Sequence, residues 1–140
     1  MAIDYGKFDK ALRNLRSQFE HYRNPDPNLP QYLQEALAES VIQRFETCYD
    51  CLWKVLKRYL VEELGLPEVP NSPKPVFRLA NENRLLPSPI ERWLRYADAR
   101  IATAHDYSGE KAREALTLMA DFIRDAEALY QILRRDGDAS

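Results

Sequence analysis

The sequence has little glycine, cysteine or histidine, and each shortage excludes a class of protein. Its 140 residues include four glycines, two cysteines and two histidines. Two thiols are too few for a small scaffold held by disulfides. A zinc site would need two ligands besides the cysteine pair, and the histidines, His21 and His105, lie far apart in the sequence. We also find no glycine-rich phosphate loop and no nucleophile motif typical of hydrolases.

The chain also lacks long apolar runs and a strong charge of either sign. No run approaches the ~20 residues of a membrane-spanning helix, and the charged N-terminal segment has no apolar signal-peptide core. A net charge of −2 argues against bulk electrostatic binding of nucleic acid or anionic membranes, although it leaves room for a local basic cleft. We therefore expect a cytoplasmic protein without a membrane partner, folded as a single domain over residues 1–140.

Apolar residues recur at alternating spacings of three and four along most of the chain, which is the pattern of amphipathic helices. The first stripe begins after Asp4, a suitable N-cap, and ends near Arg23 before a proline-rich segment. The pattern predicts further helices at about 31–64, 72–84, 89–105 and 108–133. Helices of this kind joined by short loops indicate an all-α, up-and-down bundle of about five helices.

The second predicted helix is too apolar for a surface position. Twelve of the twenty residues from Val41 to Leu60 are apolar, so we expect this long helix to be central and covered on several sides. Its C-x-x-C pair, Cys48 and Cys51, is then interpreted as two small buried side chains. Tyr49 and Trp53 are open to two interpretations, a base-stacking platform or core residues, and the apolar surroundings favour the core.

The fourth predicted helix ends in the string Arg100-Ile-Ala-Thr-Ala-His105-Asp-Tyr107. Successive residues of an α-helix are about 100° apart around its axis. If Ile90 is placed at 0°, the apolar stripe is centred near 0° and includes Ile101. Arg100 then lies about 80° to one side and His105 about 60° to the other. We expect them to meet only if two copies pack about a two-fold axis, with His105 of one chain near Arg100 of the other.

An arginine and a histidine brought together in this way suit metal-independent RNA cleavage. A histidine can move the protons of the 2′-hydroxyl and of the leaving group, while a guanidinium binds phosphate oxygens in a bidentate fork. The spacing alone is weak evidence, because Arg16 and His21 share it inside a regular helix. The plain alternative is that Arg100 and His105 only solvate a helix end.

Glu46 and Asp50 lie four residues apart on the second predicted helix. Either carboxylate can orient Arg100 or His105 from that helix. The other interpretation is a solvated strip of charges, with Arg44 and Lys54 close by, in which each favourable pair contributes a few tenths of a kcal/mol. The sequence does not decide between the two.

Two stretches resemble a known family. The segment from Val41 to Leu60 resembles the long-helix signature of the nucleotidyltransferase substrate-binding proteins, a branch of the HEPN superfamily. Trp93 and the string from Arg100 to Tyr107 resemble the second signature of that branch. The likeness runs from about residue 4 to 133, with the helices in the same order.

The resemblance implies a HEPN-like homodimer encoded beside a minimal nucleotidyltransferase. In related toxin–antitoxin pairs the HEPN member is an RNase whose R-x4-H dyads line the dimer cleft, and the nucleotidyltransferase silences it by adding AMP to the motif tyrosine. Carried over to this sequence, the catalytic dyad is Arg100 and His105, and the AMP acceptor is Tyr107. The family signature also keeps acids at the positions of Glu46 and Asp50. The chain itself would need no cofactor, since ATP and magnesium would serve the nucleotidyltransferase.

One position departs from the family pattern. HEPN motifs often carry a polar residue, commonly asparagine, directly after the arginine, where this chain has Ile101. Its place in the apolar stripe predicts a packing role.

We expect a metal-independent ribonuclease toxin, with a non-catalytic substrate-binding subunit of a nucleotidyltransferase as the alternative. A dimer is also expected because the second and fourth helices carry more apolar surface than a 16.4 kDa monomer should cover.

Overall fold

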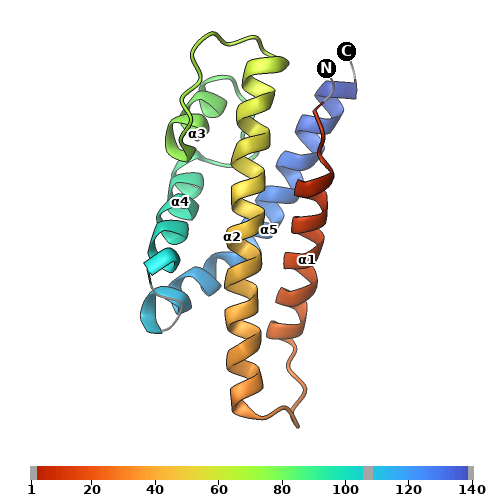
Figure 1. Cartoon of the computed structure of the whole chain (residues 1–140), viewed down its shortest axis with the longest axis vertical. Helices are drawn as coiled ribbons and strands as arrows, with labels where there is room; N and C mark the ends of the chain where they lie inside the picture. The colour runs from red at the N-terminus through yellow and green to blue at the C-terminus, as the bar shows by residue number, and fades with distance from the viewer. Residues whose placement is uncertain (1–2, 106–108, 139–140) are drawn as a thin grey trace.

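Five α-helices make up the fold, and the computed structural model describes residues 3–105 and 109–138. These residues contain no strand, which confirms the expected all-α bundle. The helices are α1 (Gly6–Arg23), α2 (Gln31–Glu62), α3 (Pro73–Glu82), α4 (Ile90–His105) and α5 (Gly109–Asp138). In Figure 1, α1, α2 and α5 form the long part of the bundle, and α3 and α4 pack beside α2.

The helix α1 begins close to the expected cap. The Oδ1 atom of Asp4 accepts a hydrogen bond of 2.8 Å from the Gly6 backbone N–H, which satisfies one of the donors left open at a helix start. The predicted stripe is the face that enters the core, with Phe8, Leu15 and Phe19 buried. Its burial places α1 against α2 and α5.

The long helix α2 is central, as its composition predicted. It packs against each of the other four helices. Cys48 is fully buried and Cys51 half-buried, and burial raises the pKa of both thiols. The helix ends at Glu62, and Gly65 follows with a φ of 64°, a left-handed conformation that suits glycine after a helix end.

The buried face of α4 differs from the predicted stripe. The residues inside the core are Trp93, Tyr96, Ala97 and Thr103, whereas Ile101 is 56% exposed. The helix is therefore rotated by about 80° from the expected orientation, and the packing role predicted for Ile101 is wrong. The reason is that two large aromatic rings bury more apolar surface than the aliphatic residues of the stripe.

The two large aromatic residues of α4 are buried with their polar atoms satisfied. Trp93 Nε1 donates to the Ser88 hydroxyl at 2.9 Å, and the Tyr96 hydroxyl donates to Asp125 Oδ2 at 2.5 Å. Arg92 binds the same carboxylate with two nitrogens, at 2.8 and 3.0 Å. This cluster joins α4 to α5 and fixes the rotation of α4.

Little large apolar surface remains outside the core. Among the described residues the exposed large hydrophobic side chains are Tyr32, Leu33, Val61, Leu64 and Ile101. All five lie on the second or fourth helix or directly after the second, which are the two helices on which the sequence predicts surplus apolar surface. None of the helices, over the residues described, is long and apolar enough to cross a membrane.

Candidate functional site

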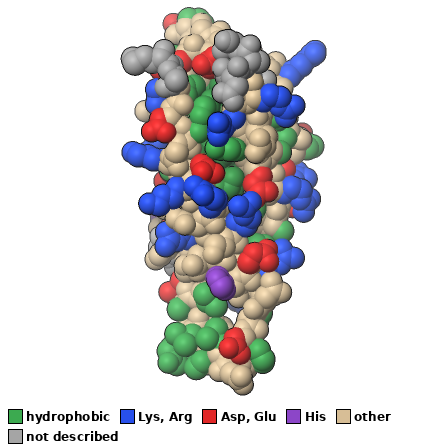
Figure 2. Space-filling view, turned by 90° about the vertical axis from the view of Figure 1, so that its right-hand side faces the viewer, with side chains coloured by type: hydrophobic (Ala, Val, Ile, Leu, Met, Phe, Trp, Pro, Cys, Tyr) green, Lys and Arg blue, Asp and Glu red, His purple; other side chains and the backbone are tan. Residues whose placement is uncertain are grey.

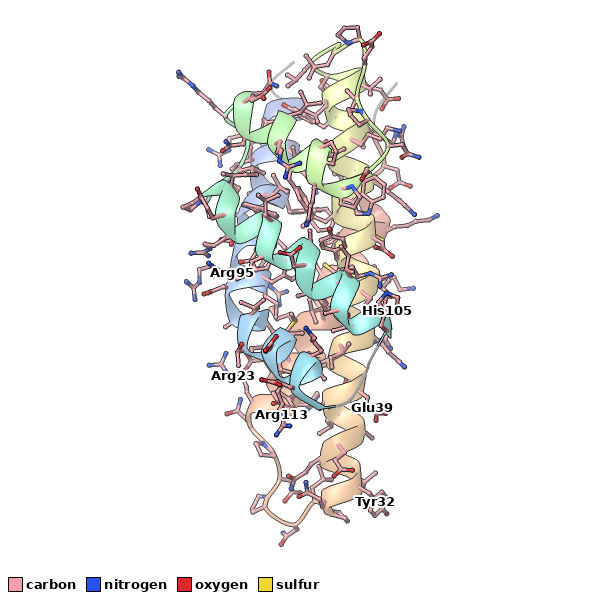
Figure 3. All side chains as sticks on the ribbon, turned by 90° about the vertical axis from the view of Figure 1, so that its left-hand side faces the viewer. Arg23, Tyr32, Glu39, Arg95, His105 and Arg113 are labelled. Carbon is pink, nitrogen blue, oxygen red and sulfur yellow. The ribbon has the colours of Figure 1, made fainter. Side chains whose placement is uncertain are left out.

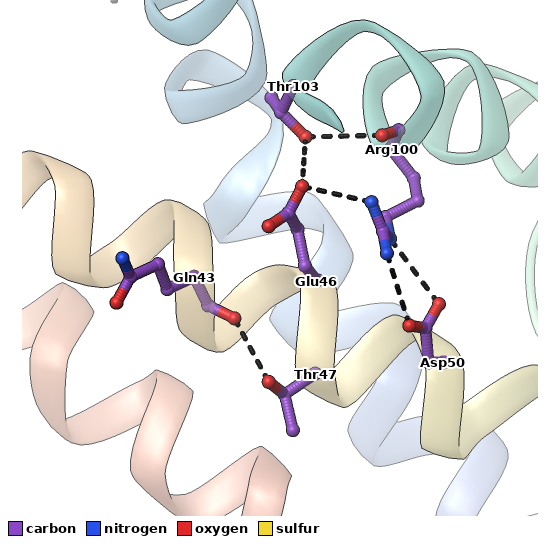
Figure 4. Close-up of polar contacts among 6 residues, drawn as sticks. All are labelled: Gln43, Glu46, Thr47, Asp50, Arg100 and Thr103. Atoms are coloured by element: carbon purple, nitrogen blue, oxygen red, sulfur yellow. Dashed lines mark hydrogen bonds and ion pairs between the residues drawn. The ribbon is translucent and has the colours of Figure 1, made fainter. Parts of the chain in front are cut away.

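Arg100 is the centre of a polar network between α4 and α2. Its Nη1 atom lies 3.0 Å from Glu46 Oε2, and its Nε and Nη2 atoms lie 3.3 and 3.2 Å from the two carboxylate oxygens of Asp50 (Figure 4). Glu46 and Asp50 reach the same guanidinium because they stand one turn apart on one face of α2. Of the two interpretations of these acids, the structure shows the one in which they hold Arg100.

The Glu46 carboxylate is the buried part of this network. Glu46 is only 8% exposed, and besides Arg100 it accepts a hydrogen bond of 3.0 Å from the Thr103 hydroxyl. A buried carboxylate is costly unless it is paired and hydrogen-bonded, and Arg100 and Thr103 supply both kinds of partner to Glu46 inside the bundle. In return, the buried acid fixes the direction of the Arg100 side chain.

A hollow of about 480 Å³ opens beside this network. Both Arg100 and His105 line it, together with Trp53 from α2 and Lys74 from the start of α3. Figure 3 shows His105 at the end of α4, next to α2, and the side chain is exposed. One protomer therefore brings the arginine and the histidine to the same hollow. The rotation of α4 turns Arg100 toward α2 and leaves His105 exposed at the end of the helix, while the two side chains stay about 140° apart around the helix axis.

The remaining predicted positions fall in three places. Ile101 lines the hollow next to Arg100, where its exposed side chain meets solvent. Tyr49 is buried in the core, as expected, but Trp53 is only half-buried. Tyr107, the expected AMP acceptor, lies outside the described residues.

Sequence reasoning missed Thr103 and Lys74. Thr103 lies about two helical turns after Tyr96, on the same face of α4. A buried face centred on Tyr96 instead of Ile90 would therefore have included it. Lys74 lies in the first turn of α3, and only the packing of α3 against α2 and α4 brings it to the hollow.

The charges around the hollow are balanced. The Lys74 ammonium lies 2.7 Å from Asp98, and two carboxylates face Arg100. No group of three or more histidine, cysteine or acidic side chains among the described residues is arranged to hold a metal ion. The cationic or basic side chains at the hollow are an imidazole, a guanidinium and an ammonium, and the Asp50 carboxylate and the Tyr49 and Ser72 hydroxyl side chains line it as well.

The other arginine–histidine pair of the sequence has different surroundings. His21 is exposed on α1, and Arg16, five residues earlier, pairs with Glu127 of α5. Figure 2 shows this face, where basic and acidic side chains alternate across the middle of the molecule. Arg13 has its own partner here, Asp9 at 2.8 Å.

Comparison with known proteins agrees with this fold. A family model described as "Nucleotidyltransferase substrate binding protein like" matches residues 3–135. A Haemophilus influenzae protein named "Probable ribonuclease HepT" is 29% identical over 108 residues, which cover 76% of this chain and 73% of that protein.

Two solved structures are also similar. One is a Haemophilus influenzae protein, described as revealing the fold of a substrate binding domain of a nucleotidyltransferase; its TM-score is 0.83 at 27% identity, over 94% of this chain and 99% of that chain. The other is a Thermus thermophilus protein with a TM-score of 0.76 at 33% identity, over 91% of this chain and 98% of that chain. Since the family model spans nearly the whole sequence, the chain belongs to the nucleotidyltransferase substrate-binding-like family.

Proposed function

We propose that this protein is a metal-independent endoribonuclease that works with a minimal nucleotidyltransferase. The observation that carries the proposal is that Arg100 and His105 line one hollow, with Arg100 held in a fixed direction by Glu46 and Asp50. Membership of a nucleotidyltransferase substrate-binding-like family supports the partner, and a relative named as a probable ribonuclease supports the activity.

The chemistry requires two proton transfers and one site for the phosphate. The 2′-oxygen of the substrate attacks the adjacent phosphorus, and the bond from phosphorus to the 5′-oxygen breaks. His105 serves the proton transfers, one from the 2′-hydroxyl and one to the departing 5′-oxygen, as an imidazole does in general acid–base catalysis. Arg100 binds the non-bridging phosphate oxygens, whose charge is part of the transition state. The products are a 2′,3′-cyclic phosphate and a 5′-hydroxyl end.

The direct test is cleavage of labelled single-stranded RNA by the purified protein in excess EDTA. We expect cleavage to continue without divalent metal and to leave cyclic phosphate ends. Arg100→Lys should reduce the rate strongly, because an ammonium lacks the planar fork. Cleavage that stops in EDTA and returns with a divalent metal ion would overturn the mechanism, and no cleavage under any condition would overturn the activity.

A second candidate is a non-catalytic substrate-binding subunit of a nucleotidyltransferase. Its support is that two carboxylates already face the Arg100 guanidinium, so the site presents little net positive charge to a phosphate. The two functions differ in one result. A binding subunit should alter the activity of its nucleotidyltransferase while leaving RNA intact, with Arg100→Lys affecting only the partner.

The proposal includes control by AMP transfer to Tyr107. Tyr107 stands two residues after His105, and a nucleotide attached there would bring a phosphodiester close to the residues that bind RNA phosphate. The test is incubation with the neighbouring nucleotidyltransferase, ATP and magnesium, followed by mapping of adducts by mass spectrometry. AMP on other tyrosines but never on Tyr107 would contradict this control.

The proposal also includes a two-fold dimer. A dimer would bring two copies of the hollow to one cleft, which suits a substrate as long as RNA. Light scattering at micromolar concentration measures the mass directly. A stable monomer of 16.4 kDa that cleaves RNA at the full rate would remove the dimer from the account and leave the single-chain site in place.

A further inference from the structure

We propose that the hollow beside Arg100 is a subsite for one unpaired nucleobase, which stacks on Trp53. The inference rests on the proposed function for the identity of the ligand, a single-stranded RNA. It adds a residue that determines which form of RNA is bound, and it assigns a role to the part of an aromatic ring that packing against the core leaves uncovered.

Trp53 differs from the other aromatic residues in the second half of α2. Tyr49 and Tyr59 are buried in the core, whereas Trp53 is half-buried. Both Tyr49 and Trp53 line the hollow, but only Trp53 is partly exposed to solvent there. The other tryptophan of the chain, Trp93, is fully buried and hydrogen-bonded to Ser88. A partly exposed indole in a hollow presents a flat apolar surface, and every nucleobase has a flat face that stacks on such a ring.

The remaining walls suit an uncharged flat group. Pro73, Ala97, Ile101 and Ala104 line the hollow with small or aliphatic surfaces. The volume of about 480 Å³ lies within the usual range of pockets for small organic ligands, roughly 300 to 1,000 Å³. The exposed side chain of Ile101, at a position where related motifs carry a polar residue, is then part of an apolar subsite.

The charged groups at the rim suit the phosphates on either side of a bound base. Lys74 and Arg100 line the hollow. The Lys54 ammonium lies over the Trp53 ring, 5.9 Å from its centroid, as a cation–π partner. Asp98 and Asp50 offset the charges of Lys74 and Arg100, so electrostatic attraction to a polyanion is weak. Stacking must therefore supply much of the affinity, and removal of the ring should weaken binding about tenfold or more.

The subsite predicts a preference for single-stranded RNA. A base in a duplex is stacked on both faces and paired at its edge, so it cannot enter a hollow without first leaving the helix. Unpaired bases in loops and single strands are already available. The geometry thus favours single strands over duplexes of the same length.

The test measures the binding of three oligonucleotide probes to the His105→Ala variant, with tryptophan fluorescence as the signal. The probes are a short single-stranded oligoribonucleotide, an abasic oligonucleotide with the same number of phosphates, and the oligoribonucleotide annealed to its complement. We expect saturable quenching by the first probe and at least tenfold weaker binding of the other two. Trp53→Leu in the same background should weaken binding of the first probe about tenfold, and the fluorescence that remains, from buried Trp93, should not respond.

Two further variants serve as controls. One keeps an aromatic ring at position 53, and the other removes an exposed aromatic ring far from the hollow. Trp53→Phe keeps a stacking ring and should retain most of the affinity. Tyr32→Leu removes an exposed aromatic residue elsewhere on α2, 69% exposed, and should leave binding unchanged. Equal affinity for the abasic and base-containing strands, or unchanged affinity in Trp53→Leu, would overturn the subsite. Absence of quenching together with a change of oligomeric mass in Trp53→Leu would also overturn it, by showing that a second copy covers the ring.

The subsite and the proposed ribonuclease can fail separately. Base-dependent quenching that requires Trp53, in a protein that never cleaves RNA, would establish the subsite and contradict the nuclease. Cleavage by the protein with an unchanged rate and unchanged affinity in Trp53→Leu would establish the nuclease and contradict the subsite.

Discussion

Arg100 and Glu46 stand 54 residues apart in the sequence and 3.0 Å apart in the structure, where they join α4 to α2. The acid is nearly buried and the arginine lines a hollow open to solvent. The pair therefore connects the interior of the bundle to the surface on which a substrate would bind. Because the acid cannot move without losing its partners, it limits the directions in which the guanidinium can point.

Glu46→Gln should reduce RNA cleavage without unfolding the protein. Glutamine keeps the size of the side chain but removes the charge that orients Arg100, and misplacement of a binding group by about 1 Å costs on the order of 100-fold in rate. We expect kcat/KM to fall roughly 10- to 100-fold, with an unfolding free energy lower by about 1.5–3 kcal/mol.

The matched control for this variant is Glu39→Gln. Glu39 lies on the same helix and is exposed, so its replacement should leave cleavage and stability within error of the wild-type protein. Circular dichroism confirms that both variants are folded. A fully active Glu46→Gln protein would show that the orientation of Arg100 does not depend on the buried acid.

Tyr96→Phe should reduce stability and leave the activity of the folded protein unchanged. The Tyr96 hydroxyl donates to Asp125, a carboxylate that is 5% exposed and that keeps Arg92 as its remaining partner. Loss of one hydrogen bond to a charged group costs about 1.5–3 kcal/mol. Urea denaturation measures the loss, and cleavage assays well below the unfolding transition measure the activity. A large loss of activity at full folding would mean that the α4–α5 cluster also sets the geometry of the hollow.

The free energy of unfolding should fall at alkaline pH because buried tyrosine and cysteine side chains keep their protons in the folded protein. Burial raises the pKa of Tyr49 and Tyr96 above the ordinary value of 10.0, and burial raises that of the Cys48 thiol above 9.0. Their folded forms keep the proton while the unfolded forms release it. Each group therefore contributes stability that is complete below its unfolded pKa and is lost as the pH rises above it.

Urea denaturation between pH 7 and 11 measures this dependence. The free energy of unfolding should begin to fall above about pH 9, with a contribution of about 1.4 kcal/mol per pH unit from each fully titrating group. Replacing both Tyr49 and Tyr96 by phenylalanine should flatten the decline above about pH 10. An identical pH profile in the double variant would show that these hydroxyls ionise freely in the folded protein.

The fold was predictable from the sequence because the signals for each helix are local. The alternating spacing of apolar residues in α1, the proline at the start of α3 and the excess of apolar residues in α2 each depend on neighbours in the chain. The expected positions differ from the observed helix bounds by only a few residues.

The orientation of α4 was not predictable in the same way. The aliphatic residues from Ile90 to Ile101 suggested one face, but the observed face is set by Trp93 and Tyr96, whose polar atoms find partners in Ser88 and Asp125. Those partners lie five and 29 residues away, and the pairing with Asp125 depends on tertiary packing. The same rotation decides that Glu46 contacts Arg100, which is why the sequence left the role of that acid open.

The measurement that tests the central claim most directly compares the two histidines of the chain. Single-turnover cleavage of one labelled single-stranded RNA in EDTA is measured for the wild-type protein, His105→Ala and His21→Ala. Both histidines are exposed and both follow an arginine by five residues, but only His105 is at the hollow that contains Arg100. We predict that His105→Ala lowers the rate by about 10²- to 10⁴-fold, the usual cost of removing a general acid–base, and that His21→Ala retains nearly the full rate. Small and equal effects at both positions would contradict the catalytic assignment.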